Sequence, residues 1–503
     1  MALSSILNQA SFRTWAVAIS ACLVIWAAAH WWLAYRRLRH IKGPGLASIS
    51  SLWIFYQTCR SRIYLAGDEA LQRYGSIVRI APNCILTNDP VFLRVMAAPR
   101  SGFTRSRYFE ATRVDAQSDH LLSLRDEAAH AALRAKVLPG YSGKEVTTLE
   151  SDIDARVVDL LDLIRRDYVS QEKPLDFARL SGFFTLDSLT TIAFGNAMGY
   201  LKTNEDLFHY FHMSSKLYPI VEHTMHHWSI HQIVQTIQKM VTVPSDVGMG
   251  AIVTAVNKGV RERFTAPSTT ETPSDMLNSF ICRGLTELEC ESEAILQIMA
   301  GADSTAHALR ITFYHLLSNP TAYLKLMAEM DAALQSGQIS YPVIQNSEAQ
   351  ALPYLRACIM EGLRMFMPLN GISTRLSPSP DGYTHNGIYI PAGTEVGISI
   401  YSMLRRKDIF GPDADTFRPE RWFDKDTERL KARERVQEMV FGTGRTSCLG
   451  KDIAWMELRK VIFELFRNFE FSIVNPLAGV KTWSNGVVVQ EGMYVRAWPR
   501  KKD

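Results

Sequence analysis

The chain has 503 residues, of which 47% are apolar and 21% are charged, and its formal net charge is +4 at pH 7. This length suits a large hydrophobic core, and no internal repeat or long low-complexity linker divides it. So small a net charge excludes a nucleic-acid-binding protein that relies on overall charge. The seven cysteines are scattered without a C-x-x-C pair. This excludes a disulfide framework and indicates a reducing compartment for the main body.

Residues 14–35 form an apolar run that predicts a membrane anchor. The run is interrupted by Ser20 and His30 and is otherwise rich in Trp, Ala, Val and Ile. At the rise of an α-helix, a run of this length spans about 30 Å of hydrocarbon. A cleaved signal peptide would have a shorter apolar run, with its basic residues before it.

The charges around this run predict its orientation. Basic residues follow it directly at Arg36, Arg37, Arg39 and Lys42, whereas Arg13 stands alone before it. This asymmetry places the main body on the cytosolic side. We therefore expect four segments: a short luminal N-terminus (1–13), a transmembrane helix (14–35), a basic linker with a Pro-Gly turn (36–46) and one main domain (47–503).

The main domain is predicted to be mainly α with a minor β part. Apolar residues at helical spacing predict helices over most of the chain to residue 350, including one long helix that Asn319-Pro320 ends. Runs of β-branched residues with Pro and Gly predict small sheets. The expected elements are a helical stretch (48–75), a strand pair (76–88), the long helix (291–318), a small sheet (370–400) with a hairpin turn at Asn386-Gly387, and a second hairpin (483–498).

One glycine-rich segment, Phe441-Gly-Thr-Gly444-Arg-Thr-Ser-Cys448-Leu-Gly450, runs into an apolar helical stretch. Its glycines allow a tight turn and a close approach to a flat partner. A cysteine at the start of a helix lies near backbone N–H groups, which favour the thiolate. Such a thiolate suits an axial ligand of heme iron, where it favours O–O cleavage. The alternative is a structural cysteine beside a turn.

Two further motifs accompany this segment. Glu361 and Arg364 are three residues apart in a helical pattern, and Arg421 follows in Phe417-Arg-Pro-Glu-Arg-Trp422. Upstream, Ala300-Gly-Ala-Asp-Ser-Thr305 interrupts an apolar helix with an acid and hydroxyls. The order and spacing of these motifs resemble the cytochrome P450 family of heme-thiolate monooxygenases over nearly the whole chain. Together with residues 73–83, they are similar to fungal microsomal members of the pisatin demethylase type.

The resemblance implies a large helical domain with a small β-rich region around heme b, whose iron is bound by the Cys448 thiolate. It also assigns roles to individual residues. Proton delivery belongs to Asp303, Ser304 and Thr305; the heme loop includes Phe441, Gly444, Cys448 and Gly450; the propionates face His130, Arg134 and Arg375; Ala300 and Gly301 leave room beside the macrocycle; and a buried scaffold joins Glu361, Arg364 and Arg421.

The chain departs from the family pattern at two places. Ser304 stands where the family usually has threonine, so the hydroxyl is kept without the stiff β-branched rotamer. Thr446 stands two residues before the cysteine, where the family commonly has Arg or His. Arg445 is one position earlier, and it faces either the electron donor or a propionate. The charge-rich stretch 425–435, with Arg445 and Lys451, is either a solvated face or part of a docking surface for an acidic reductase.

The resemblance implies a monooxygenase that inserts one atom of O₂ into a lipophilic small molecule in fungal secondary metabolism. It also implies a single-pass protein of the endoplasmic reticulum membrane, in contact with its lipid. The chain has no glycine fingerprint for a nucleotide, so NADPH electrons must come from a separate NADPH-cytochrome reductase. The substrate pocket is expected from residues 108–122, 207–228, 369–373 and 483–487.

Other functions remain open at this point. A heme-thiolate isomerase or dehydratase would use the same ligand, although Asp303-Ser304 argues against it because that chemistry needs no proton relay. A non-enzymatic heme-binding membrane protein is the other alternative. A zinc site could also use the histidines at 223, 226, 227 and 231, although no cysteine or acid completes a convincing ligand set.

Overall fold

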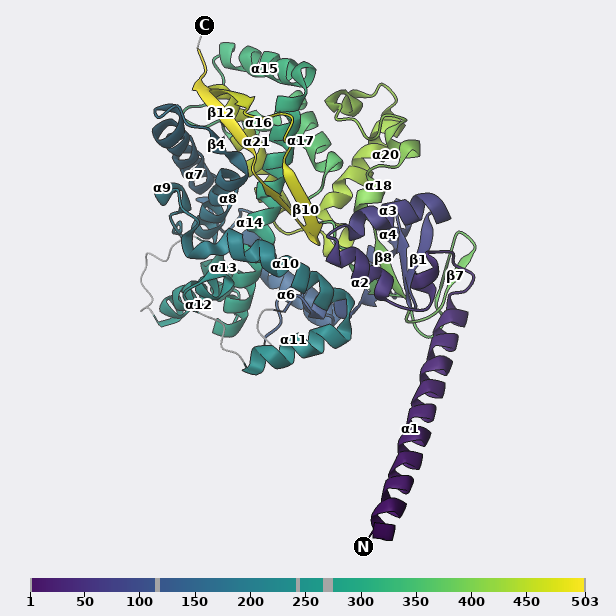
Figure 1. Cartoon of the computed structure of the whole chain (residues 1–503). Coiled ribbons are helices and arrows are strands. Elements are labelled where there is room, and N and C mark those ends of the chain that lie inside the picture. Colours follow the sequence, from purple (N-terminus) through teal and green to yellow (C-terminus); the bar gives the residue numbers. More distant parts are fainter. Residues whose placement is uncertain (1, 114–117, 241–244, 266–274, 502–503) are drawn as a thin grey trace.

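Helix α1 (Ala2–Arg37) projects from the body of the protein as a single rod (Figure 1). The computed structural model describes residues 2–113, 118–240, 245–265 and 275–501. Residue 1 of the expected luminal segment and residues 114–117 of the expected pocket segment therefore lie outside the described residues. Within α1, residues Val17–Arg37 are long and apolar enough to cross a membrane, and their most apolar part is not buried against the rest of the protein. This helix fits a single transmembrane anchor.

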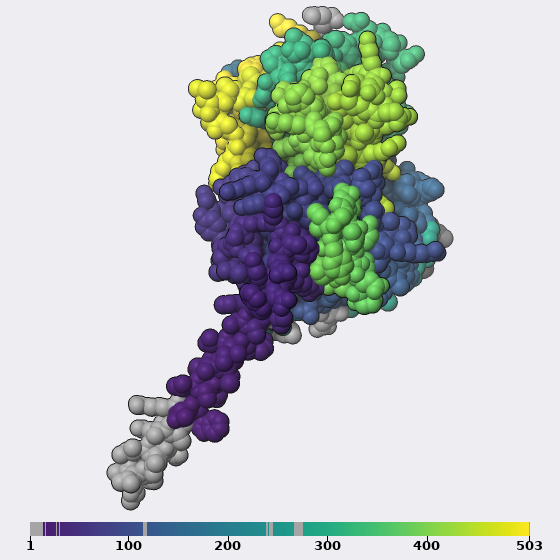
Figure 2. All heavy atoms as spheres, turned by 90° about the vertical axis from the view of Figure 1, so that its right-hand side faces the viewer, coloured from purple at the N-terminus to yellow at the C-terminus, as the bar shows by residue number. Residues whose placement is uncertain are grey.

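The expected linker after the anchor is packed against the body. The buried guanidinium of Arg79 donates hydrogen bonds to the carbonyl oxygens of Ala34 at 2.8 Å and Tyr35 at 3.2 Å, in the last turn of α1. Arg37 donates to the carbonyl of Ala392, beside the hairpin β6 (Tyr383–His385)–β7 (Ile388–Ile390). Figure 2 shows this hairpin, in green, against the base of α1. The linker therefore holds the anchor in a defined direction.

The minor β part forms one larger sheet and three smaller assemblies. The larger sheet has the order β1-β2-β8-β5-β3, in which β2 is parallel to β8 and the other pairs are antiparallel. Its strands are β1 (Ile77–Ala81), β2 (Cys84–Thr87), β3 (Thr104–Arg105), β5 (Thr374–Leu376) and β8 (Glu395–Ile398). The expected strand pair at 76–88 is confirmed. The strands expected at 370–400 divide between this sheet and the β6–β7 hairpin, because β5 and β8 pair with strands from the N-terminal region.

The prediction of one C-terminal hairpin over 483–498 was wrong in extent. The hairpin joins β10 (Lys481–Asn485) to β11 (Val487–Glu491). The next strand, β12 (Tyr494–Pro499), instead pairs with β9 (Phe469–Ile473) and β4 (Leu175–Asp176). Gly492 has φ +74° between β11 and β12 and turns the chain into this second sheet, a conformation that glycine adopts without strain.

The central helix, α14 (Glu287–Ser318), begins four residues before its predicted start. Thr286 and Glu289 form a capping box there, and Pro320 begins the following helix at the predicted stop. The helical stretch expected at 48–75 is two helices, α2 (Leu52–Cys59) and α3 (Ile63–Tyr74). They are divided where Ser61 has φ +51°. Helices therefore lie in the predicted regions, but they begin and end at other residues than predicted.

The other α-helices cover α14 and the sheets. They are α4 (Pro90–Ala97), α5 (Arg107–Glu110), α6 (Glu127–Tyr141), α7 (Leu149–Leu163), α8 (Phe177–Phe194), α9 (Tyr200–Thr203), α10 (Tyr210–His226), α11 (Trp228–Met240), α12 (Gly248–Thr265), α13 (Met276–Cys282), α15 (Pro320–Gln335), α16 (Asn346–Gln350), α17 (Pro353–Met365), α18 (Ile400–Met403), α19 (Lys407–Phe410), α20 (Thr427–Gln437) and α21 (Lys451–Asn468). Shorter helical turns are η1 (Gly45–Ser48), η2 (Ile164–Val169), η3 (Leu207–His209), η4 (Pro419–Phe423), η5 (Glu438–Phe441) and η6 (Gly444–Thr446).

Candidate active site

The loop that carries Cys448 is folded tightly between η5 and α21. The backbone N–H of Cys448 donates to the carbonyl of Phe441 at 2.7 Å, which closes the loop on itself. Gly444 has φ +58°, and a Cβ there would lie 2.7 Å from the carbonyl oxygen of Ala97 at the end of α4. Only glycine fits this position. By contrast, a Cβ on Gly450 would meet nothing within 4 Å, so the fold does not require glycine at that position.

The Cys448 thiol has a raised pKa in the absence of a bonded cation. Burial raises it, and the Gly450 N–H, Arg134 and Lys451 lower it by smaller amounts. The backbone at the start of the helix thus lowers the pKa of Cys448 as expected, but burial raises this pKa by more. The sulfur is crowded by protein, yet the Cys448 residue is exposed. A metal cation bound to such a sulfur deprotonates it, so thiolate formation at this site depends on the bonded ion.

A cluster of cations lies near this loop, and sequence reasoning missed one of its members. Arg105, at the end of β3, is buried and donates through Nη1 to the carbonyl of Leu121 at 3.0 Å. Burial, and then the positive charge of Arg375, lower its pKa to about 10. Arg375 also has a pKa of about 10, because of burial and then Arg445. Arg445 is 3.5 Å from a carboxylate oxygen of Glu127. This group, Arg105, Arg134, Arg375 and Arg445, is called the arginine cluster below.

His130 is a neutral member of the same neighbourhood. Its Nε2 lies 2.6 Å from Nη2 of Arg105, which donates to it. Burial and then Arg105 lower the pKa of the imidazole to about 3, so His130 carries no positive charge at neutral pH. His130 therefore accepts a hydrogen bond from Arg105 as a neutral side chain, which does not match its expected role as a propionate cation.

The arginine cluster has unsatisfied donors that fit the carboxylates of a heme. Among the described residues, Nε of Arg105, Nη1 of Arg375 and Nε of Arg445 are buried and have no hydrogen-bond partner. Unpaired buried donors are costly, and two propionates would supply the missing acceptors. Arg445 thus turns inward to the cluster. Thr446 donates its hydroxyl to the Thr443 carbonyl at 3.0 Å.

The residues of the 300–305 motif face different sides of α14. Ala300 is exposed although most of α14 is buried, so it borders open space. Gly301 faces another helix, because a Cβ there would lie 3.1 Å from Leu189 of α8. The expectation that both small residues leave room for a macrocycle therefore fits Ala300, whereas Gly301 allows two helices to pack closely. Asp303 and Thr305 are buried, and the Ser304 hydroxyl donates to the Ala300 carbonyl at 2.6 Å.

Glu361, Arg364 and Arg421 form one buried ionic cluster. Glu361 lies 2.8 Å from Nη2 of Arg364 and 3.3 Å from Nε of Arg421, and all three side chains are inaccessible. Trp422 adds an indole hydrogen bond to Glu361 at 3.1 Å. Removing one member would leave an uncompensated buried charge, at a cost of roughly 3–5 kcal/mol.

The four segments expected to line the pocket meet in the structure. Gly486, between β10 and β11, accepts a hydrogen bond from the backbone N–H of Asn370 at 2.7 Å. A Cβ on Gly486 would lie 2.4 Å from a carboxylate oxygen of Glu222 on α10. The rings of His226, on the same helix, and Tyr108 are 5.4 Å apart. Glu222 and His226 pair at 3.0 Å, so a buried polar pair lies where these segments meet.

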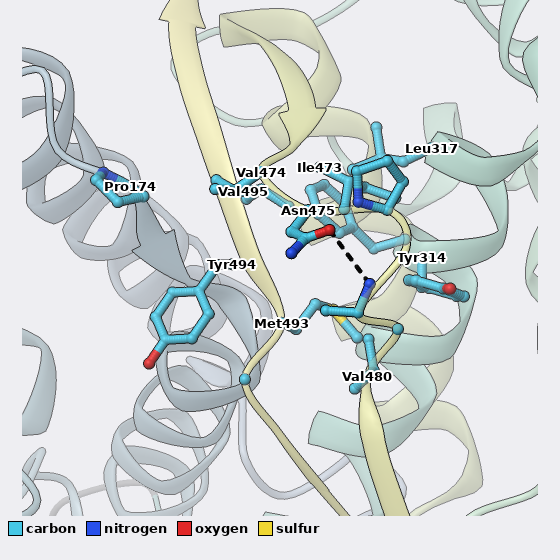
Figure 3. Close-up of a pocket in the computed structure, with 15 residues that line it drawn as sticks. Pro174, Tyr314, Leu317, Ile473, Val474, Asn475, Val480, Met493, Tyr494 and Val495 are labelled. Atoms are coloured by element: carbon cyan, nitrogen blue, oxygen red, sulfur yellow. Dashed lines mark hydrogen bonds between the residues drawn. The ribbon is translucent and has the colours of Figure 1, made fainter.

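A cavity lies away from Cys448, between the β9–β12 strands and the C-terminal part of α14 (Figure 3). It has a volume of about 130 Å³ and is lined mostly by apolar side chains, including Leu317, Val480 and Met493. Its lining contains no residue of the predicted site.

Two alternatives left open by the sequence, the zinc site and the charged docking stretch, can be compared with the structure. Within the described ranges, no group of three or more His, Cys, Asp or Glu side chains is arranged to hold a metal ion, so the zinc alternative has no support. The charged stretch 425–435 pairs many of its charges locally: Arg429 and Arg433 with Asp424, and Lys431 with Glu428. Such pairing is typical of a solvated face.

Comparison with known proteins agrees with this geometry. The family model "Cytochrome P450" matches residues 44–494. The chain is 38% identical to the cytochrome P450 monooxygenase ABA1 of Pyricularia oryzae over 97% of both chains. It is 36% identical to abl1 of Leptosphaeria maculans over 94% of this chain and 85% of that protein. It is 28% identical to pkfB of Emericella nidulans over 91% of both. The chain therefore belongs to the cytochrome P450 family, is a monooxygenase of the heme-thiolate type, and uses a heme whose iron is bound by cysteine.

Proposed function

We propose that this chain oxidises a lipophilic small molecule in fungal secondary metabolism, with NADPH electrons from a separate NADPH-cytochrome reductase. The observation that carries the proposal is the arginine cluster, which has unpaired buried donors and whose Arg134 lies beside the loop of Cys448. The relatives with the highest identities given above are fungal monooxygenases, which supports the organism class and the reaction type. The apolar α1 supports a single-pass location in the endoplasmic reticulum membrane, with the body in the cytosol and in contact with lipid.

The heme, when bound through Cys448, supplies the activation of O₂. Arg105, Arg134, Arg375 and Arg445 hold its propionates, and His130 orients Arg105. Ala300 leaves space on the α14 side. Phe441, Gly444 and Gly450 shape the loop around the sulfur.

Asp303, Ser304 and Thr305 handle protons on the α14 side. Burial raises the pKa of the Asp303 carboxyl, which suits a group that must exchange protons near neutral pH. The isomerase or dehydratase alternative needs no such acid, and a non-enzymatic heme protein needs neither acid nor hydroxyl.

The test uses the full chain expressed with a fungal NADPH-cytochrome reductase in microsomes. The reduced carbon-monoxide complex is expected to show the red-shifted Soret band of thiolate heme, and Cys448→Ser is expected to abolish it. NADPH consumption should require the reductase, and mass spectrometry of fed pathway intermediates should show a mass gain of one oxygen atom or the loss of an alkyl group. Product formation from an organic peroxide without NADPH, and none with NADPH, would favour the isomerase alternative.

A further inference from the structure

Tyr218, on α10, contacts the acid of α14. Its hydroxyl donates a hydrogen bond to Oδ2 of the buried Asp303. Arg310, about two turns further along α14, lowers the pKa of the same carboxyl by its positive charge, whereas Asp206, which precedes α10, raises it. Arg310 is itself fixed, because its Nε donates to the Ser181 hydroxyl of α8 at 2.7 Å. The acid is therefore held by a hydrogen bond from α10 and lies near a positive charge that α8 keeps in place.

The acid and the alcohol of the motif have different partners. The Ser304 hydroxyl donates within α14, to the carbonyl of Ala300 at 2.6 Å. Asp303 instead accepts its hydrogen bond from Tyr218, which belongs to α10. The orientation of the carboxyl consequently depends on how α10 lies against α14.

Helix α10 has a weak point directly beside this contact. Pro219 follows Tyr218 within the helix and has no N–H to donate to the carbonyl of Ser215. Leu217 and Ile220, which flank the pair, are exposed. One side of α10 thus contacts the buried acid while the other faces outward, and the helix can bend where Tyr218 is attached.

We propose that Tyr218 is a positioning residue for Asp303, and that it makes proton supply to the oxygenation reaction depend on the seating of α10. This inference rests on the proposed function, in which Asp303 is the proton-exchanging acid. The tyrosine hydroxyl stabilises the charged carboxylate through a charge-assisted hydrogen bond. Without it, the pKa of Asp303 rises and the carboxyl stays protonated to higher pH.

The experiment compares Tyr218→Phe with Tyr210→Phe. Both changes remove one hydroxyl from a buried or half-buried tyrosine of α10. Within the part of the chain that the structure describes, the Tyr210 hydroxyl makes no hydrogen bond to Asp303, so it is the matched control. Heme-loaded proteins are assayed for hydrogen–deuterium exchange of residues 218–226. They are also assayed with reductase and NADPH, without added substrate, for the share of electrons released as hydrogen peroxide from pH 5 to pH 9.

Tyr218→Phe is expected to speed exchange in residues 218–226 several-fold and to move the midpoint of the peroxide profile up by about one to two pH units. Tyr210→Phe should match the wild type in both. In an Asp303→Ala background, which lacks both the acid and the hydrogen-bond acceptor, Tyr218→Phe should add nothing to either readout. If Tyr218→Phe does not retain heme, exchange in Asp303→Ala tests the same contact from the other side.

Wild-type exchange and an unshifted profile in Tyr218→Phe would overturn the inference. Faster exchange with an unshifted profile would also overturn it, because a purely structural contact would give that result. A wild-type protein that consumes no NADPH with the reductase contradicts the proposed function instead, and the exchange data then decide whether Tyr218 seats α10 on Asp303.

Discussion

Arg105 and Arg107 lie two residues apart and have opposite environments. Arg105 is buried in the arginine cluster, whereas Arg107 is exposed with its guanidinium over the ring of Trp228. We expect Arg105→Ala to weaken heme binding about 10- to 100-fold, because it removes a charge-assisted donor to a propionate. Arg107→Ala should retain heme. Heme-to-protein ratios after transfer to excess apomyoglobin measure this difference, and equal loss in both variants would contradict the assignment of Arg105.

Glu457 predicts a pH dependence of stability. It is buried in α21, where the Ser188 hydroxyl donates to it at 2.6 Å, and burial raises the pKa of its carboxyl to about 7. Because the folded protein binds this proton more tightly than the unfolded chain, its contribution to stability is complete below about pH 4.5 and is lost as pH rises through about 7.

Glu457→Gln should remove that contribution to the pH slope. We expect the glutamine variant to gain stability relative to the wild type between about pH 5 and pH 8, by up to about 3 kcal/mol. Thermal unfolding at several pH values measures the effect. Asp452→Asn, in the same helix at an exposed position, is the control. A wild-type slope in Glu457→Gln would show that the carboxyl is ionised in the folded protein throughout this range.

At the scale of elements, Arg79 joins the anchor to the first strand of the sheet. Its four hydrogen bonds end on carbonyl oxygens of α1 and of the β1–β2 turn. Cationic side chains stabilise the C-terminal end of a helix in this way. We expect Arg79→Ala to free the linker, so that trypsin cuts after Arg36, Arg37 or Arg39 several-fold faster in detergent. Arg73→Ala, at an exposed position of α3, should leave the cutting rate unchanged. Equal rates in both variants would show that other contacts hold the linker.

At the scale of the whole molecule, α1 is not the only apolar surface. Exposed apolar side chains also occur on α2, α10 and α11, including Phe55, Ile220, Ile233 and Ile237. Deleting residues 1–35 should therefore release only part of the protein from microsomes at physiological salt, since patches of this kind retain some membrane affinity. Sedimentation with and without carbonate measures the two fractions. Complete release would show that α1 alone binds the membrane.

The orientation of the anchor gives a second prediction at this scale. The basic residues that follow the apolar run place the body in the cytosol. Protease added to intact microsomes should digest the body while an internal luminal marker survives. Full protection of the body would reverse the proposed topology.

The sequence by itself determined the features that depend on local spacing. The apolar run of α1, the strand pair at 76–88, the turn at Asn386-Gly387 and the stop at Asn319-Pro320 were predicted correctly, because each depends on residues that are neighbours in the chain. The family was also recognisable, since the motifs around Cys448, Glu361 and Asp303 keep their order and spacing.

The tertiary structure alone decided which distant residues meet. Arg105 entered the arginine cluster because β3 pairs with β5, and no local pattern distinguishes it from Arg107. Burial among other arginines made His130 neutral, a property that its own helix does not show. Gly301 serves the packing of α14 on α8, and Tyr218 reaches Asp303 from a helix 85 residues earlier. Charge and protonation in a core depend on desolvation and on neighbours brought by the fold, so spacing along the chain could not predict them.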